Sequence, residues 1–307
     1  MSIGTANPAH PAVALRHRIN VEQLSPSQLG HVRQAFAASQ AIADDRGYER
    51  WAGIHGLPLP MYCTHGSPLF LPWHRAYLYS FELSLRDASP GITGFALPWW
   101  DWTSPGSHAR GIPEAYAAAT DDSGDPNPLF SAAVDPRAIK QDLAQGDRVG
   151  PRTVRRPGPP SELPSTADVR QALAASDFLD FSGLVEDIHN NVHSWVGGHM
   201  GEIPVAAFDP LFWAHHCMID RLWRIWQLQH LGSAVPASLM GQALAPFPMT
   251  VAQTIDATSL GYDYAATVSL AKPQLVSAGG AAARLVPPIP TPPAPNPPST
   301  PTRHGQP

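Results

Sequence analysis

Histidines inside an apolar helical segment are the feature that most constrains this chain. Residues 211–226 are predicted to form a helix that begins after Asp209 and Pro210, two residues suited to a helix start. The segment is apolar almost all round, and such a helix belongs in a protein core. Yet His215 and His216 lie at its centre. Each nitrogen of a buried imidazole needs a partner, and a metal ion can supply one of them.

Other segments carry histidines in a similar setting. His189 and His193 lie four residues apart in a predicted helix over 182–196, so they share one face. His65 and His74 flank a turn-rich stretch, and His74 is expected in the first turn of the next helix. A lone buried histidine is usually a hydrogen-bonded core residue, but three such helices favour a metal site. Imidazole suits zinc, copper, iron and nickel, so the residues alone leave the metal open, a dizinc hydrolase included.

Composition excludes several classes of protein. The chain has 307 residues, of which 43% are hydrophobic and 15% charged, enough for a globular core. The formal net charge is -5, and the only dense basic group, within 152–156, lies among prolines, so no nucleic-acid partner is expected. No apolar run approaches the ~20 residues that span a bilayer, so no membrane is expected either. Residues 1–18 show no signal-peptide pattern, which predicts a cytoplasmic protein.

The fold is predicted to be mainly α, with a central four-helix bundle that holds the metals, long irregular loops and a few short strands near the termini. Residues 1–270 are expected to form one domain, and the Pro/Ala-rich residues 271–307 an extended or disordered tail. Residues 47–67 are predicted to be a loop because they are rich in Gly and Pro. Helices are expected at four places: 26–45, 72–87, 182–196 and 211–230.

Several segments resemble the copper-binding signatures of the tyrosinase (polyphenol oxidase) family of type-3 dicopper proteins. The resemblance covers roughly residues 13–265 and suggests a short form without the C-terminal shielding domain. The segments that carry it are, in order, Gly53–Gly56, His65–Arg75 with Glu82, His189–Gly198, Asp209–Asp220 and Leu260–Tyr264.

The resemblance implies two copper ions as cofactors. In the family signature the second histidine of an adjacent pair is the ligand, which selects His216 over His215. Cys63 resembles the cysteine that forms a thioether with the ligand histidine two residues on, here His65, in fungal and some bacterial members. One copper would be held by His55, His65 and His74, and the other by His189, His193 and His216.

The same resemblance implies oxidation of phenols by O2, with ortho-hydroxylation of monophenols and oxidation of o-diphenols to o-quinones. Glu186 and Asn190 would hold a water that deprotonates a monophenol, which favours a tyrosinase. Ser194 and Ile203 would line an open substrate pocket.

Asp220 lies one turn after His216. It is predicted either to orient the ligands from a second shell or to form a surface ion pair with Arg224, and the sequence does not choose between them.

Alternatives remain at the level of function. A catechol oxidase or an o-aminophenol oxidase would share every copper ligand but lack monophenolase activity. An oxygen-binding protein of the hemocyanin kind would block phenol access with a bulky side chain, and none is evident here. The expected partners are O2 and small phenols, and a copper-loading helper protein is a further candidate.

Overall fold

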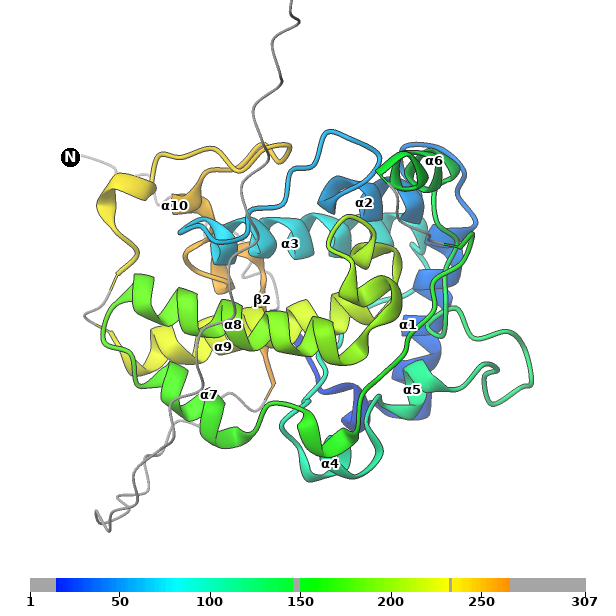
Figure 1. Ribbon diagram of the computed structural model, residues 1–307, viewed down its shortest axis with the longest axis horizontal. Helices are drawn as coiled ribbons and strands as arrows, with labels where there is room; N and C mark the ends of the chain where they lie inside the picture. Colours follow the sequence, from blue (N-terminus) through cyan, green and yellow to red (C-terminus); the bar gives the residue numbers. More distant parts are fainter. Residues whose placement is uncertain (1–14, 146–149, 232–233, 266–307) are drawn as a thin grey trace, which may run out of the picture. The chain divides into compact units, whose positions relative to one another are not determined.

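The structure, a computed structural model, describes residues 15–145, 150–231 and 234–265. The predicted tail, 271–307, lies outside these ranges. The described part is mainly α-helical, as the sequence predicted (Figure 1). Its α-helices are α1 Pro26–Gln40, α2 Tyr48–His55, α3 Phe70–Ala88, α4 Pro105–Arg110, α5 Glu114–Ala117, α6 Pro136–Gln145, α7 Thr166–Leu173, α8 Phe178–Val196, α9 Leu211–Gln229 and α10 Val251–Thr254.

The four predicted helices are confirmed as α1, α3, α8 and α9. Local capping explains the starts of two of them: Ser25 forms a capping box with Gln28 before α1, and the Asp177 side chain accepts two backbone N–H groups before α8. The Asp209 carboxylate accepts the backbone N–H of Leu211 at 2.9 Å, where α9 begins. The ends are less well predicted, since α1 stops at Gln40 rather than at 45.

The prediction of a loop over 47–67 is wrong for its first part, because α2 occupies Tyr48–His55. Tyr48 and Ile54 are buried, and this packing stabilises a short helix that contains a glycine. Gly53 has a packing reason as well: a Cβ there would lie 3.1 Å from Pro58 Cδ. The glycines that suggested a loop therefore belong to a closely packed helix.

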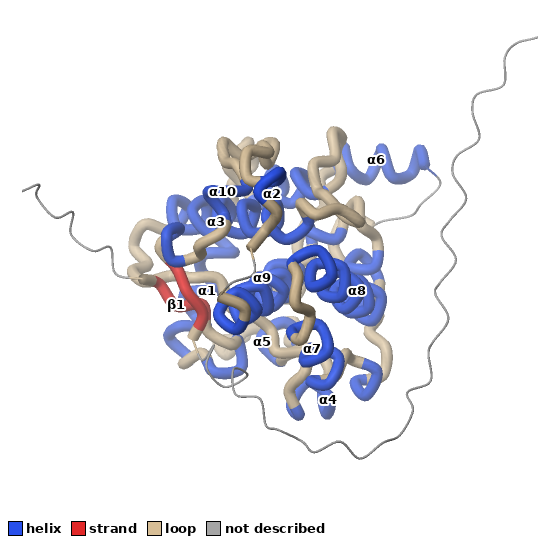
Figure 2. The backbone as a smooth tube through the Cα atoms, turned by 90° about the vertical axis from the view of Figure 1, so that its left-hand side faces the viewer, coloured by secondary structure: helices blue, strands red, loops and turns tan. Residues whose placement is uncertain are grey.

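The three 19-residue helices α3, α8 and α9 pack against one another (Figures 1 and 2). α2 completes the bundle, because the ring of its Tyr48 packs against Phe81 of α3 and Trp213 of α9. Aromatic side chains fill the contact between α3 and α9. The rings of Phe81 and Trp213 stack with their centroids 3.6 Å apart, and Tyr77 lies against Trp213 at 4.8 Å. A rigid aromatic core of this kind fixes the faces that carry the histidines.

Two short strands join the ends of the described chain, as predicted. β1 (Arg16–Arg18) pairs in parallel with β2 (Tyr262–Tyr264). No helix in the described ranges is both long and apolar enough to cross a bilayer.

Candidate metal centre

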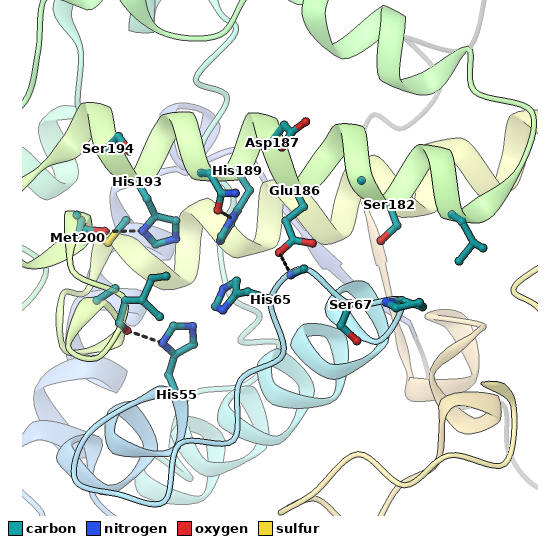
Figure 3. A pocket seen from close by; sticks show the side chains of 18 residues that line it. His55, His65, Ser67, Ser182, Glu186, Asp187, His189, His193, Ser194 and Met200 are labelled. Carbon is teal, nitrogen blue, oxygen red and sulfur yellow. Dashed lines mark hydrogen bonds between the residues drawn. The ribbon is translucent and has the colours of Figure 1, made fainter. Parts of the chain in front are cut away.

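The bundle brings together six histidines from four helices and one loop. His55 is the last residue of α2, His74 lies in the second turn of α3, and His65 lies in the loop between them. α8 supplies His189 and His193, and α9 supplies His216. Figure 3 shows four of these side chains pointing toward one space: His55, His65, His189 and His193.

In the α8–α9 group, three ring nitrogens converge. His216 Nε2 lies 3.2 Å from His189 Nε2 and 3.2 Å from His193 Nε2. Two nitrogens that each lie ~2.0 Å from a tetrahedral ion are separated by roughly 3.3 Å. The spacing is therefore that of ligands around one metal ion.

Hydrogen bonds at the far side of each ring set the tautomer. His193 Nδ1 donates to the carbonyl of Met200 at 2.7 Å, and His189 Nδ1 donates to Asn190 Oδ1 at 3.0 Å (Figure 3). A proton on Nδ1 leaves a lone pair on Nε2. His189 and His193 thus both direct lone pairs at His216, which can donate only one proton from its Nε2. At least one close contact is then between two lone pairs, and a cation between the nitrogens removes that repulsion.

The second group is built by His55, His65 and His74, with ring centroids 5.3 to 5.7 Å apart. His55 Nδ1 donates to the carbonyl of Ile203 at 3.0 Å, and His74 Nδ1 to that of Phe70 at 2.8 Å. The Nε2 atoms of His55 and His74 are buried and have no partner. Buried acceptors without a partner are costly, so these atoms also fit a metal ion.

Cys63 belongs to the same neighbourhood, with Sγ 3.5 Å from His65 Nδ1. It groups with His55 and His65 as closely as metal ligands do. Burial raises the pKa of its thiol to about 12, however, so at neutral pH the sulfur is protonated and a weak ligand. The imidazole of His74 is the better third donor.

The imidazoles are neutral at physiological pH. Burial lowers the pKa of His65 and of His193 to about 4. Burial, with neighbouring histidines adding to it, lowers the pKa of the other four well below the ordinary range. Neutral imidazole is the form that binds metals.

His215 also lies near the α8–α9 group, and both of its ring nitrogens are buried without a partner. Its ring stacks on that of His189 at a centroid distance of 5.2 Å and an angle of 18°. The nitrogen 3.2 Å from both α8 histidines is that of His216, so the geometry favours His216 as the donor.

A cavity of about 700 Å³ opens on both groups of histidines. Glu186 and Asn190 line it from α8, Glu186 with its carboxylate accepting the backbone N–H of Gly66 at 2.6 Å. Burial raises the pKa of Glu186. Ser194 and Ile203 line the cavity too, and Ile203 is 48% exposed. The structure thus brings together the six predicted ligands and the four predicted catalytic and pocket residues.

Asp220 is placed differently from either prediction. It is buried, and its carboxylate accepts hydrogen bonds from the side chains of Arg18, Arg75, Tyr262 and Tyr264. The predicted pair with Arg224 is wrong, because Arg224 pairs with Asp263 at 3.0 Å. None of the Asp220 side-chain bonds goes to a histidine; they join β1, α3, α9 and β2 instead. Local sequence spacing gave no sign of these partners.

Two adjoining groups of neutral imidazoles, in a helical bundle and beside an open cavity, define a dinuclear metal centre with histidine ligands. The family described as the common central domain of tyrosinase matches residues 45–229. The chain belongs to the tyrosinase family, whose members bind two copper ions, and the histidine groups described above fit them.

The relatives include both oxygen carriers and enzymes. Hemocyanin units G and H of Sepia officinalis are 33% identical over 231 residues, which cover 68% of this chain and 37% of that protein. Tyrosinase of Podospora anserina is 31% identical over 301 residues, covering 73% of this chain and 52% of the relative. The chain thus spans about a third to a half of these two relatives.

Solved structures agree on the fold. A functional unit of octopus hemocyanin superposes with a TM-score of 0.69 at 28% identity, covering 82% of this chain and 68% of that one. Tyrosinase from Burkholderia thailandensis gives a TM-score of 0.70 at 23% identity, covering 84% of this chain and 75% of that one. Membership of the family is therefore shared with proteins of two different activities, and the residues around the cavity must distinguish them.

Proposed function

We propose that this chain is a copper-dependent phenol oxidase of the tyrosinase type, which hydroxylates monophenols at the ortho position and oxidises o-diphenols to o-quinones. The observation that carries the proposal is the cavity of about 700 Å³ with four of the six histidines in its wall. An oxygen carrier needs access only for O2, whereas a phenol oxidase must admit an aromatic ring. The cavity volume is in the range of sites that bind small organic molecules.

The proposed ligands are His55, His65 and His74 for one copper ion, and His189, His193 and His216 for the other. When bound, the copper pair supplies dioxygen binding and the two-electron oxidation of the phenol. The chain's own part is to hold the imidazoles in one tautomer through the carbonyls of Ile203, Phe70 and Met200. Such outer contacts orient metal ligands and raise their basicity.

A monophenol must lose its hydroxyl proton before its oxygen can bind the centre. Glu186 is a suitable acceptor because burial raises the pKa of its carboxyl group above that of an exposed glutamate. Asn190 uses Oδ1 for His189, so its amide N–H groups are the part left to hold a water. We propose that the proton passes from the phenol oxygen through this water to Glu186.

The Glu186→Gln variant tests this role. Glutamine keeps an oxygen for the Gly66 N–H but cannot take up the proton. We expect kcat/KM for tyrosine to fall by about a hundredfold, with catechol oxidation changed far less. In the unaltered protein, hydroxylation should decline as pH falls through the raised pKa of Glu186, since only the carboxylate is a base, and this acid limb should vanish in the variant. Equal losses on tyrosine and catechol would contradict the proposal.

We also propose a thioether between Cys63 and His65, whose sulfur and ring nitrogen lie 3.5 Å apart. It would replace one S–H and one ring C–H bond, so the peptide that spans both residues should be lighter by two hydrogen atoms after exposure to copper and oxygen. Mass spectrometry of a denatured digest measures this. Cys217 serves as the internal control, because it should still react with an alkylating reagent. Full alkylation of Cys63 would exclude the crosslink.

One experiment separates the candidate functions. The chain is loaded with copper, hydrogen peroxide is added, and near-ultraviolet absorption is recorded before tyrosine, catechol and 2-aminophenol are supplied. A tyrosinase should gain the absorption and oxidise tyrosine. A catechol or aminophenol oxidase should gain it but spare tyrosine, an oxygen carrier should oxidise none of the three, and a zinc hydrolase should gain no absorption.

A further inference from the structure

The charged side chains around the cavity all have one sign. Among the described residues, Glu186 and Asp187 are the charged residues that line it, and no lysine or arginine does. The histidines in the wall add no formal charge of their own, because imidazole binds a metal ion in its neutral form. The protein's own contribution to the potential in the cavity is therefore negative.

The end of the cavity away from the α8–α9 histidines offers hydrogen-bonding groups as well. Ser182 lies one turn before Glu186 on α8, and its hydroxyl points toward the loop that carries Ser67 (Figure 3). Ser182 is only 3% exposed, and its Oγ has no hydrogen-bond partner. A buried hydroxyl without a partner is costly, so this atom is suited to bond a ligand.

There is room for a substituent beside this hydroxyl. Gly183, the next residue, lines the cavity, and a Cβ placed on it would meet nothing within 4 Å. A phenol whose hydroxyl faces the histidines can place its para substituent against the α8 wall of the cavity, which Glu186 and Asp187 both line.

Asp187 has a special position because it also lines a neighbouring cavity of about 650 Å³, together with Ser194. In Figure 3 its side chain lies on the opposite side of α8 from that of Glu186. The neighbouring cavity is acidic too. Among the described residues that line it, Glu162, Asp168 and Asp187 are acidic and Arg156 alone is basic. Asp187 thus lies between two cavities whose charged residues are mainly acidic, and a substrate that enters past it meets negative charge from both cavities.

We infer that this site selects phenols whose para substituent ends in a protonated amine over those that end in a carboxylate, and that Asp187 is a specificity-determining residue. The inference rests on the proposed function. An exposed carboxylate attracts an ammonium and repels a carboxylate by a modest amount each, so the discrimination is a matter of several-fold.

Three diphenols that differ in the charge of the ring substituent test this: dopamine, 4-methylcatechol and 3-(3,4-dihydroxyphenyl)propionate. Diphenols avoid any dependence on monophenol hydroxylation. We expect kcat/KM to follow that order in the copper-loaded protein at low ionic strength. In Asp187→Asn the ratio of dopamine to the propionate should fall by about three- to fivefold. Added salt should likewise lower the ratio of kcat/KM for dopamine to that for the propionate in the unaltered protein, because it screens the carboxylate.

Asp87→Asn is the matched control, because Asp87 is an exposed aspartate in α3 and does not line the cavity. It makes the same change in net charge and should leave the ratio unchanged. The inference is overturned if the propionate is oxidised as well as dopamine, or if Asp187→Asn and Asp87→Asn give the same ratio.

Binding of substrate analogues without hydroxyl groups keeps this inference separate from the proposed function. Calorimetry should show that phenethylamine binds the protein more tightly than 3-phenylpropionate, and that Asp187→Asn reduces the difference. If 4-methylcatechol is not oxidised, the proposed function fails, while this binding difference still supports the charge selection. If 4-methylcatechol is oxidised and no binding difference is found, only the charge selection fails.

Discussion

Replacing His216 by alanine is expected to reduce the copper content of the loaded protein from two ions per chain to one. His216 Nε2 is the atom that lies 3.2 Å from both α8 histidines, so its loss leaves the second ion with two imidazoles. Two ligands on one helix cannot complete the coordination shell, and removal of a ligand from such a site eliminates most of its affinity. Elemental analysis after dialysis measures the change.

The neighbouring residue supplies a matched control. His215 lies in the same helix and is as fully buried as His216. Its ring stacks on that of His189, which the ring of His216 also contacts. His215→Ala should therefore lose similar packing and yet retain two copper ions. Far-ultraviolet circular dichroism of both variants establishes whether α9 still folds. If His215→Ala loses an ion and His216→Ala keeps both, the ligand has been assigned to the wrong member of the pair.

Sequence predicted the helices whose signals are local. α9 follows an Asp-Pro start and is apolar almost all round, and the two histidines of α8 follow directly from helical spacing. The capping Asp177 was not recognised, so the start of α8 was predicted at 182 rather than at Phe178. Sequence failed at α2, because a short segment with a glycine forms a helix only through burial of residues such as Tyr48. His55 was consequently found by resemblance alone, although it ends a helix and has an oriented ring.

The partners of Asp220 could not be predicted for a different reason. Arg18 is 202 positions away in the sequence and Arg75 is 145 away, and no periodicity links residues at such distances. Only the fold shows that β1, α3 and β2 meet α9 at this carboxylate. The charge selection attributed to Asp187 is likewise a property of the assembled cavity, since the absence of lysine and arginine from its wall is invisible in the sequence.

The second large effect concerns stability. It comes from the Asp220 cluster, which consists of Asp220 and its partners Arg18, Arg75, Tyr262 and Tyr264. Asp220→Ala is expected to lower the free energy of unfolding by about 3–5 kcal/mol, because it leaves the buried Arg75 without its counter-ion and Arg18 with Glu82 alone. Arg18 and Arg75 have side chains that are 0% exposed, and neither can be neutralised at ordinary pH. Urea unfolding of the copper-free protein measures the loss without a contribution from metal binding.

A partly exposed ion pair on the same helix provides a comparison for this loss of stability. Arg224 and Asp263 have side chains that are 16% and 20% exposed, and they join α9 to β2 as Asp220 does. Asp263→Ala should cost about 1 kcal/mol or less, since water solvates the arginine that remains. Equal losses of unfolding free energy in the two variants would show that the Asp220 cluster contributes no more to stability than this partly exposed pair.

The pH dependence gives an independent check on the same carboxylate. Burial alone would raise the pKa of Asp220, but Arg75 and Arg18, together with the hydroxyl groups of Tyr264 and Tyr262, outweigh it and hold that pKa below its usual range. A depressed pKa means that the stabilisation is complete above the unfolded-state value of ~3.9 and is lost as pH falls through the folded-state value. The difference in unfolding free energy between the unaltered protein and Asp220→Ala should therefore be constant from pH 7 to about pH 5 and shrink only in stronger acid. Histidine protonation acts on both proteins alike, so it cancels in this difference. A difference that already closes near pH 6 would mean that the Asp220 carboxyl group is not held ionised by the two arginines.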